Sequence, residues 1–142
     1  MAKNSLDYLI LGPAHPFRGG IADTQHELAL ALQKNGKRVE LVTFTKLYPK
    51  IFFPGKNQLI DEVAPEKLKI TQLLHVYNPT GWFKVIKYIS SKSPKTIVFR
   101  YYTPFLALSY SWIAKNLPKS IKKVAIIDNW IPHETSKFDR ML

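Results

Sequence analysis

Residues 13–44 read PAHPFRGGIADTQHELALALQKNGKRVELVTF, and this stretch decides the expected fold. A short apolar strand over 7–11 leads into it, and a loop containing Gly19 and Gly20 separates that strand from a helix predicted over 21–35. In a βαβ unit such a loop places backbone N–H groups, and about half a positive charge from the helix dipole, at the helix N-terminus. The sequence therefore predicts an anion site at this loop, with the phosphates of a nucleotide as the expected ligand.

The rest of the chain continues the alternation of strands and helices. Gly36 ends the first helix, and a second helix is expected after Asn78 as N-cap and Pro79 as first residue. A third helix, over 104–116, is apolar on most faces and is expected to be largely buried. Further strands are predicted over 39–44, within 69–76, over 96–100 and over 124–127. This order of near-continuous apolar strands predicts an α/β fold with a Rossmann-like, doubly wound parallel sheet.

Composition restricts the class of protein. The chain has 142 residues, 46% of them hydrophobic, which suits one globular domain over 1–142. No apolar run reaches the length of about 18 residues that a transmembrane helix needs, and the apolar patch near the start is too short for a secretory signal. Because the chain has no cysteine, disulfides and thiolate metal sites are excluded. A cytoplasmic location, with membrane association left open, is the expectation.

The chain carries a formal net charge of +11. Such a charge suits nucleic acid, an anionic membrane surface or an anionic soluble substrate, while lysines that are simply dispersed and solvated are the plainest alternative. No block of lysine or arginine exceeds two adjacent residues, and no RRM, KH or helix-turn-helix signature is present. Nucleic acid is therefore not an expected partner, and a membrane surface ranks ahead of it.

Ligands of doubly wound sheets bind beyond the carboxyl ends of the strands, which directs attention to the loops at 12–20, 100–104 and 128–134. The last of these holds Asp128, Asn129, an indole, His133 and Glu134 within seven residues. Such polar groups suit the binding of substrate hydroxyls, or proton transfer through the histidine. The alternative is a capping turn in which the acid or the amide satisfies backbone N–H groups.

Several other residues are open to either a structural or a functional interpretation. The first helix is expected to bury a face that includes Leu28, Ala31 and Leu32, and to leave His26 in solvent. Aromatic residues after the fourth strand, Tyr101 among them, suit either an acceptor-binding wall or core packing. No set of His, Asp and Glu has the spacing of a metal site.

Four segments together resemble the N-terminal half of a bacterial glycosyltransferase of the retaining, nucleotide-sugar-dependent GT-B family (family 4-like). They begin with the glycine loop and end with the Asp-Asn-x-x-Pro-His-Glu loop at 128–134, and they occur in the family's order over most of the chain. The segments are GPAHPFRGGIADTQHELALALQKNGKRVELVTF, NPTGWFKVIKYI, TIVFRYYTPFLALSYSWIAK and IIDNWIPHETSKFDRML. The chain differs from the family's pattern in two ways. Many relatives have histidine where this chain has Asp128, and the Glu-x7-Glu motif of the family's C-terminal domain is absent.

The resemblance implies a hexosyltransferase with two Rossmann-like domains, of which this chain is the acceptor-side one, apparently truncated. A C-terminal domain not present in this chain would bind most of the donor. The protein containing both would transfer a sugar to a glycan or glycolipid acceptor, with a lipid-linked or polysaccharide product. The nucleotide-sugar is a substrate, and neither a cofactor nor a metal is expected.

The resemblance and the loop positions assign candidate roles. Asp128 and His133 are the candidate catalytic residues. The candidate donor phosphate and sugar site is formed by Arg18, Gly19 and Gly20, and the candidate acceptor residues are His15, Asn129, Glu134 and Tyr101. His15 has a structural loop role as its alternative, and Arg18 either pairs with phosphate or braces the loop. The alternative function for the whole chain is a non-enzymatic basic α/β module that docks on an anionic membrane surface or nucleic acid.

Overall fold

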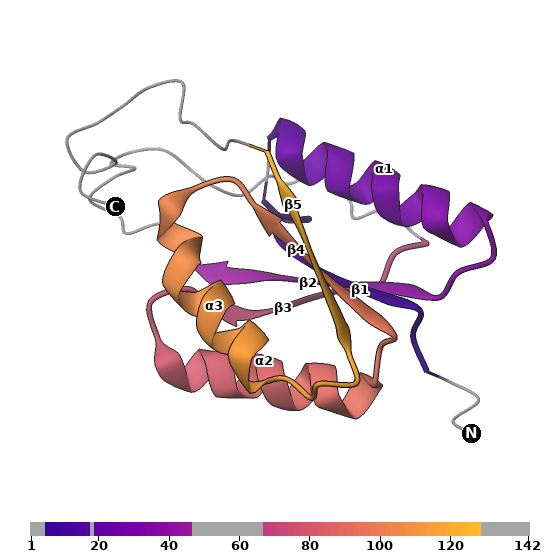
Figure 1. Ribbon diagram of the computed structural model, residues 1–142. Coiled ribbons are helices and arrows are strands. Elements are labelled where there is room, and N and C mark those ends of the chain that lie inside the picture. Colours follow the sequence, from indigo (N-terminus) through magenta and orange to yellow (C-terminus); the bar gives the residue numbers. More distant parts are fainter. Residues whose placement is uncertain (1–4, 18, 47–66, 129–142) are drawn as a thin grey trace.

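The computed structural model describes residues 5–17, 19–46 and 67–128. Its centre is a five-stranded, all-parallel sheet in the order β3-β2-β1-β4-β5, so β1 is the central strand (Figure 1). The elements in chain order are β1 (Tyr8–Leu11), α1 (Gly20–Lys34), β2 (Val39–Lys46), β3 (Ile70–His75), α2 (Pro79–Lys92), β4 (Thr96–Tyr101), the 3₁₀ turn η2 (Pro104–Leu106), α3 (Ala107–Asn116) and β5 (Lys122–Ile127).

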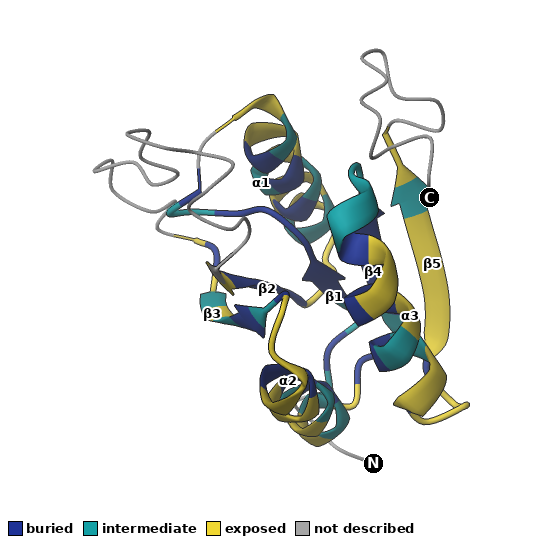
Figure 2. Cartoon of the chain, turned by 90° about the vertical axis from the view of Figure 1, so that its left-hand side faces the viewer, coloured by how far each residue is buried: buried dark blue, intermediate teal, exposed yellow. Residues whose placement is uncertain are grey.

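Helices cover both faces of this sheet. α1 lies on one face, and α2 and α3 lie on the other (Figures 1 and 2). Alternate residues of β1 divide between the two faces: Leu9 and Leu11 belong to the core under α2 and α3, and Ile10 belongs to the core under α1. The predicted Rossmann-like, doubly wound parallel sheet is confirmed, and strand 1 is central as predicted.

Local sequence accounts for the ends of two helices. The side chain of Asn78 accepts a hydrogen bond of 3.0 Å from the backbone N–H of Thr80, and Pro79 begins α2, as the sequence predicts. Gly36 follows the end of α1 with a φ of +80°, a conformation that favours glycine at this position.

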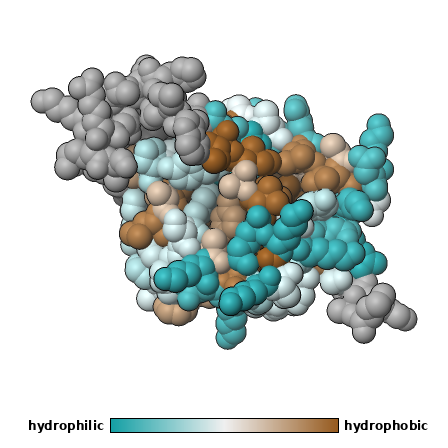
Figure 3. All heavy atoms as spheres, viewed as in Figure 1, coloured by the Kyte–Doolittle hydropathy of each residue, from teal (hydrophilic) through white to brown (hydrophobic). Residues whose placement is uncertain are grey.

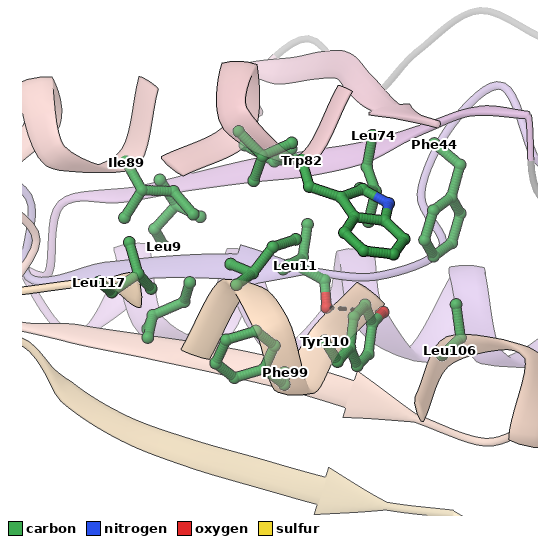
Figure 4. Packing of buried hydrophobic residues seen from close by; sticks show 14 of the residues in the cluster. Leu9, Leu11, Phe44, Leu74, Trp82, Ile89, Phe99, Leu106, Tyr110 and Leu117 are labelled. Carbon is green, nitrogen blue, oxygen red and sulfur yellow. Dashed lines mark hydrogen bonds between the residues drawn. The ribbon is translucent and has the colours of Figure 1, made fainter. Parts of the chain in front are cut away.

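The larger core lies between the sheet and the pair α2 and α3 (Figure 4). Trp82 of α2 points into it, and its indole N–H lies within 3.1 Å of the His75 carbonyl oxygen, so the ring is buried without losing its hydrogen bond. Tyr110 of α3 packs against Phe99 and donates to the Leu11 carbonyl oxygen at 3.4 Å (Figure 4). These contacts fix α2 and α3 to the sheet.

Two expectations about the helices are wrong. The segment 104–116 is not largely buried, because α3 buries Tyr110 and Ile113 on one side and leaves Leu108 71% exposed on the other. The buried side of α1 is formed by Ala22, Gln25 and Ala29, whereas Ala31 is exposed and Leu28 and Leu32 are half-buried. Two alanines and a glutamine therefore form the buried side of α1, which apolar periodicity alone does not reveal.

The described residues contain no helix long and apolar enough to cross a membrane. β5 is the outer strand on one side of the sheet and is mostly exposed, as Figure 2 shows.

Candidate functional site

The candidate site lies at the carboxyl edge of the sheet, where β1, β4 and β5 end beside the N-terminus of α1. The loop after β1 is fastened to β2 by two hydrogen bonds. The Gly12 N–H donates to the Val42 carbonyl oxygen at 3.1 Å, and the Ala14 N–H donates to the buried Thr43 hydroxyl at 3.0 Å. Phe17, also in this loop, is buried. The first part of the loop is therefore a fixed element of the site.

His26 supports the same loop from α1. Its Nε2 atom accepts a hydrogen bond of 2.8 Å from the backbone N–H of His15, which requires that nitrogen to be unprotonated. Burial lowers the pKa of His26 below its ordinary value of 6.5, the charge of nearby His15 acts in the same direction, and Asp23 opposes them. The expectation that His26 is a solvated surface residue is therefore wrong, since it is half-buried and bonded.

The two glycines of the loop have different geometries. Gly19 is the N-cap of α1 and has a φ of +129°, whereas Gly20 is the first helical residue and has no such strain. A Cβ atom at either position would meet no atom within 4 Å, so both face open space. Because Gly19 has no side chain, no side-chain hydrogen bond caps the first turn of α1. The positive end of the helix is therefore accessible.

An ion pair between a buried arginine and a more exposed aspartate lies at the ends of β4 and β5. Arg100 lies near the end of β4 and is 9% exposed. Its Nε and Nη2 atoms donate to the two carboxylate oxygens of Asp128, each at 2.6 Å. The same guanidinium donates to the Thr24 hydroxyl at 3.1 Å and to Gln25 Oε1 at 3.3 Å. Arg100 thus connects the end of β5 with the first turns of α1.

Gly12 makes room for this cluster. A Cβ atom at Gly12 would lie 2.7 Å from Arg100 Cβ and 2.8 Å from Gln25 Nε2, closer than van der Waals contact allows. Gln25 is fully buried, and its Nε2 has no hydrogen-bond partner among the residues that the structure describes. The site is therefore built on a glycine that allows an arginine and an amide to approach the backbone closely.

The structure brings together part of the predicted site. The loop after β1 and Asp128 lie on the same edge of the sheet, as predicted, because both follow parallel strands at their carboxyl ends. Through Arg100, Asp128 is linked to the helix that begins at Gly20. Four predicted site residues lie outside the described residues, namely Arg18, Asn129, His133 and Glu134.

Tyr101 lies on the other side of this edge. It lines an apolar groove of about 420 Å³ between α3 and β5, together with Phe99, Tyr110 and Ile127. The groove is open to solvent along β5 and is separate from the cluster around Arg100. Tyr101 is therefore placed at the carboxyl edge, but beside the apolar groove rather than beside the glycines.

Sequence reasoning missed Arg100, Gln25 and Thr43. Each had a signal, because Arg100 and Thr43 are polar residues inside apolar strands, TIVFRY and VELVTFTK, and Gln25 interrupts the buried side of a helix. A polar group in a strand that is buried on both faces needs a hydrogen-bond partner. The spacing of residues in the sequence does not identify that partner.

Within residues 5–17, 19–46 and 67–128, no three or more His, Asp or Glu side chains are grouped so that they could hold a metal ion. A comparison of the chain with models of known protein families gives no match. A comparison with curated proteins likewise gives no significant match.

Proposed function

We propose that this chain is the acceptor-side domain of a nucleotide-sugar-dependent glycosyltransferase, which transfers a sugar to a lipid-linked or polysaccharide acceptor. The observation that carries the proposal is the accessible N-terminus of α1 at Gly19 and Gly20, on the edge of the sheet where Asp128 also lies. Backbone N–H groups there suit the negative charge of a diphosphate, and no side chain caps them. The order of sequence motifs that resemble the GT-B family supports the same reaction.

The donor would bind with its diphosphate or transferred sugar near Gly19. The first part of the loop supports this site, since the bonds of Gly12 and Ala14 hold it against β2 before an anion arrives. In the family that the sequence resembles, most of the grip on the nucleotide comes from a second domain. The activity is therefore proposed for the protein that contains both domains.

The pairing of Asp128 with Arg100 bears on its proposed catalytic role. Both carboxylate oxygens accept hydrogen bonds from a guanidinium that stays charged at all relevant pH values. Such a pairing engages both oxygens of the carboxylate and fixes its orientation, which suits a positioning role. Under the proposal, Asp128 holds the start of the loop 128–134 in place, and His133 is the better candidate for accepting the proton of the acceptor hydroxyl.

The test uses the full-length protein and a panel of nucleotide diphosphate sugars, with donor consumption and product formation followed in the presence of extracted glycolipid. Gly20→Val should raise the donor KM or abolish transfer without unfolding the protein, because the new side chain occupies open space where the anion would bind. Ala31→Val is the matched control, since it introduces the same side chain at an exposed position near the opposite end of α1.

Absence of donor consumption with every nucleotide sugar would overturn the proposal. It would favour the alternative of a non-enzymatic basic module. Equal effects of Gly20→Val and Ala31→Val on the donor KM would show that the glycine loop is a turn without a ligand.

A further inference from the structure

We propose that the exposed side of α2 and α3 is a docking surface for an anionic lipid bilayer. The surface, here called the α2–α3 patch, combines apolar side chains with lysines. It consists of Phe83, Lys84 and Lys87 from α2, and Leu108, Trp112 and Lys115 from α3.

The apolar part of the patch is continuous across two helices. Phe83 is 62% exposed and Leu108 is 71% exposed, the two largest values among the exposed large hydrophobic residues that the structure describes. Half-buried Trp112 lies between them, because its ring packs edge-on against Phe83 with centroids 4.8 Å apart, and it follows Leu108 by four residues on the same side of α3. Single exposed apolar residues are ordinary, whereas a joined aromatic and aliphatic group marks a contact surface.

Lysines surround this group. Lys87 follows Phe83 by four residues and Lys115 follows Trp112 by three, so each lies on the same side of its helix as an apolar member. Lys84 adds a third positive charge one turn before Lys87. All three lysines are exposed. Neither α2 nor α3 contains an aspartate or a glutamate in its sequence. In the space-filling view, hydrophobic side chains are exposed among hydrophilic ones on the face formed by α3 and β5 (Figure 3).

The charge decides which partner fits. A second copy of the chain, using the same surface, would bring lysines against lysines, and like charges oppose such an interface. An anionic bilayer offers negative headgroups to the lysines and an acyl boundary to Phe83, Leu108 and Trp112, the combination by which amphipathic surfaces bind membranes. The net charge of +11 acts in the same direction at longer range.

The α2–α3 patch lies near the same edge of the sheet as the candidate functional site. α2 and α3 follow strands β3 and β4 at their carboxyl ends, so Phe83 and Leu108, which lie in the first or second turn, are near the carboxyl edge of the sheet. Docking would bring this edge, with Gly19 and Asp128, toward the headgroups. This step rests on the proposed function, since it places a lipid-linked acceptor within reach of the site, whereas the docking itself does not depend on any activity.

The test is co-sedimentation of the full-length protein with vesicles of phosphatidylcholine, alone or mixed with phosphatidylglycerol. We expect binding to the mixed vesicles that weakens as salt is raised. Replacing Lys84, Lys87 and Lys115 with glutamine should reduce the partition coefficient roughly 100-fold, given the contribution of each lysine near a charged surface. The matched control is the same replacement of Lys34, Lys37 and Lys67, three exposed lysines away from the patch.

The apolar part has its own variant, Phe83→Ser with Leu108→Ser, and its control is Leu30→Ser, an exposed leucine of α1. We expect the double variant to lose vesicle binding and to unfold at the same temperature as the wild type. Equal binding by patch and control variants, or no binding to mixed vesicles, would overturn the proposal. A concentration-dependent dimer that the double variant abolishes would assign the surface to a second copy and would overturn it as well. Vesicle binding without sugar transfer would contradict only the proposed function.

Discussion

Arg100 donates to both carboxylate oxygens of Asp128, at 2.6 Å each, and so joins the ends of β4 and β5 on the side of the sheet that α1 covers. The side chain of Arg100 is 10% exposed and that of Asp128 is 22% exposed. Water therefore screens this pair less than a surface ion pair, and each charge depends on the other. The same arginine reaches two side chains of α1, so the pair is a joint between three elements.

Arg100→Met should destabilise the protein by about 1–3 kcal/mol, because it leaves Oε1 of the buried Gln25 without its hydrogen bond and Asp128 without its ion pair. Urea unfolding followed by circular dichroism measures the change. Lys95→Met is the control, since Lys95 pairs with Asp7 at 3.2 Å but is 72% exposed, and it should cost less than about 1 kcal/mol. Similar losses in the two variants would contradict a special role for Arg100.

Under the proposed function, Asp128→Asn in the full-length protein should lower kcat/KM at least about tenfold, or about 1.4 kcal/mol, with a comparable loss for His133→Ala. If Asp128 positions the loop, Arg100→Lys should reproduce the loss in part, and the pH profile of kcat should keep its shape in Asp128→Asn. If Asp128 is the base, the acidic limb of that profile should disappear. Wild-type kinetics in both Asp128→Asn and His133→Ala would show that the loop 128–134 is a structural cap.

Stability should depend on pH through His26. Its pKa in the folded protein lies below the ordinary value of 6.5, so the unfolded chain takes up the proton first as the pH falls. Above about pH 7.5 the imidazole is neutral in both states and contributes no pH dependence. As the pH falls from there, the free energy of unfolding should decrease, until folded His26 is also protonated and its bond from the His15 N–H is lost.

His26→Gln should remove this part of the pH dependence, because glutamine does not titrate and its Oε1 can still accept from the His15 N–H. Thermal unfolding of both proteins between about pH 7.5 and about pH 5 measures the difference. Parallel curves for the wild type and the variant would contradict the prediction. An NMR titration of the His26 ring gives its pKa directly and separates it from that of His15 or His75.

Gly12→Ala should destabilise the fold by about 1–3 kcal/mol, since the added methyl group would overlap Arg100 Cβ and Gln25 Nε2. Gly20→Ala is the comparison, because a methyl group there meets no atom within 4 Å and alanine favours a helix. We expect Gly20→Ala to be as stable as the wild type or slightly more so. Chemical denaturation of the two variants side by side is sufficient, and equal stability would show that the cluster around Gly12 relaxes easily.

The fold was predictable because its signals are local. Apolar runs define the strands, Asn78 and Pro79 begin α2, and Gly36 ends α1, each within a few residues of sequence. The candidate site was predictable in its location and not in its connections. Which carboxylate Arg100 meets depends on the pairing of β4 with β5, and no local pattern encodes that contact.

The two glycines show the same limit at a finer scale. The sequence marks Gly19 and Gly20 as equivalent neighbours, but the start of α1 between them gives the left-handed φ to Gly19 alone. The exposed side of α3 shows the same limit. The sequence ALSYSWIAKN is apolar enough to predict a buried helix, and only the strand order shows that the sheet beneath it ends at β5.

The strand order also determines when the chain is able to complete its core during synthesis. Tyr8 of β1 pairs with Val39 on one side and with Thr96 on the other. A ribosome releases β2 soon after β1, but β4 appears only after α2 has been made. Until then one edge of the most buried strand has no neighbour, and its apolar residues stay accessible to chaperones or to other nascent chains. Slowing translation between residues 46 and 96 would therefore prolong the interval in which this protein is most prone to aggregate.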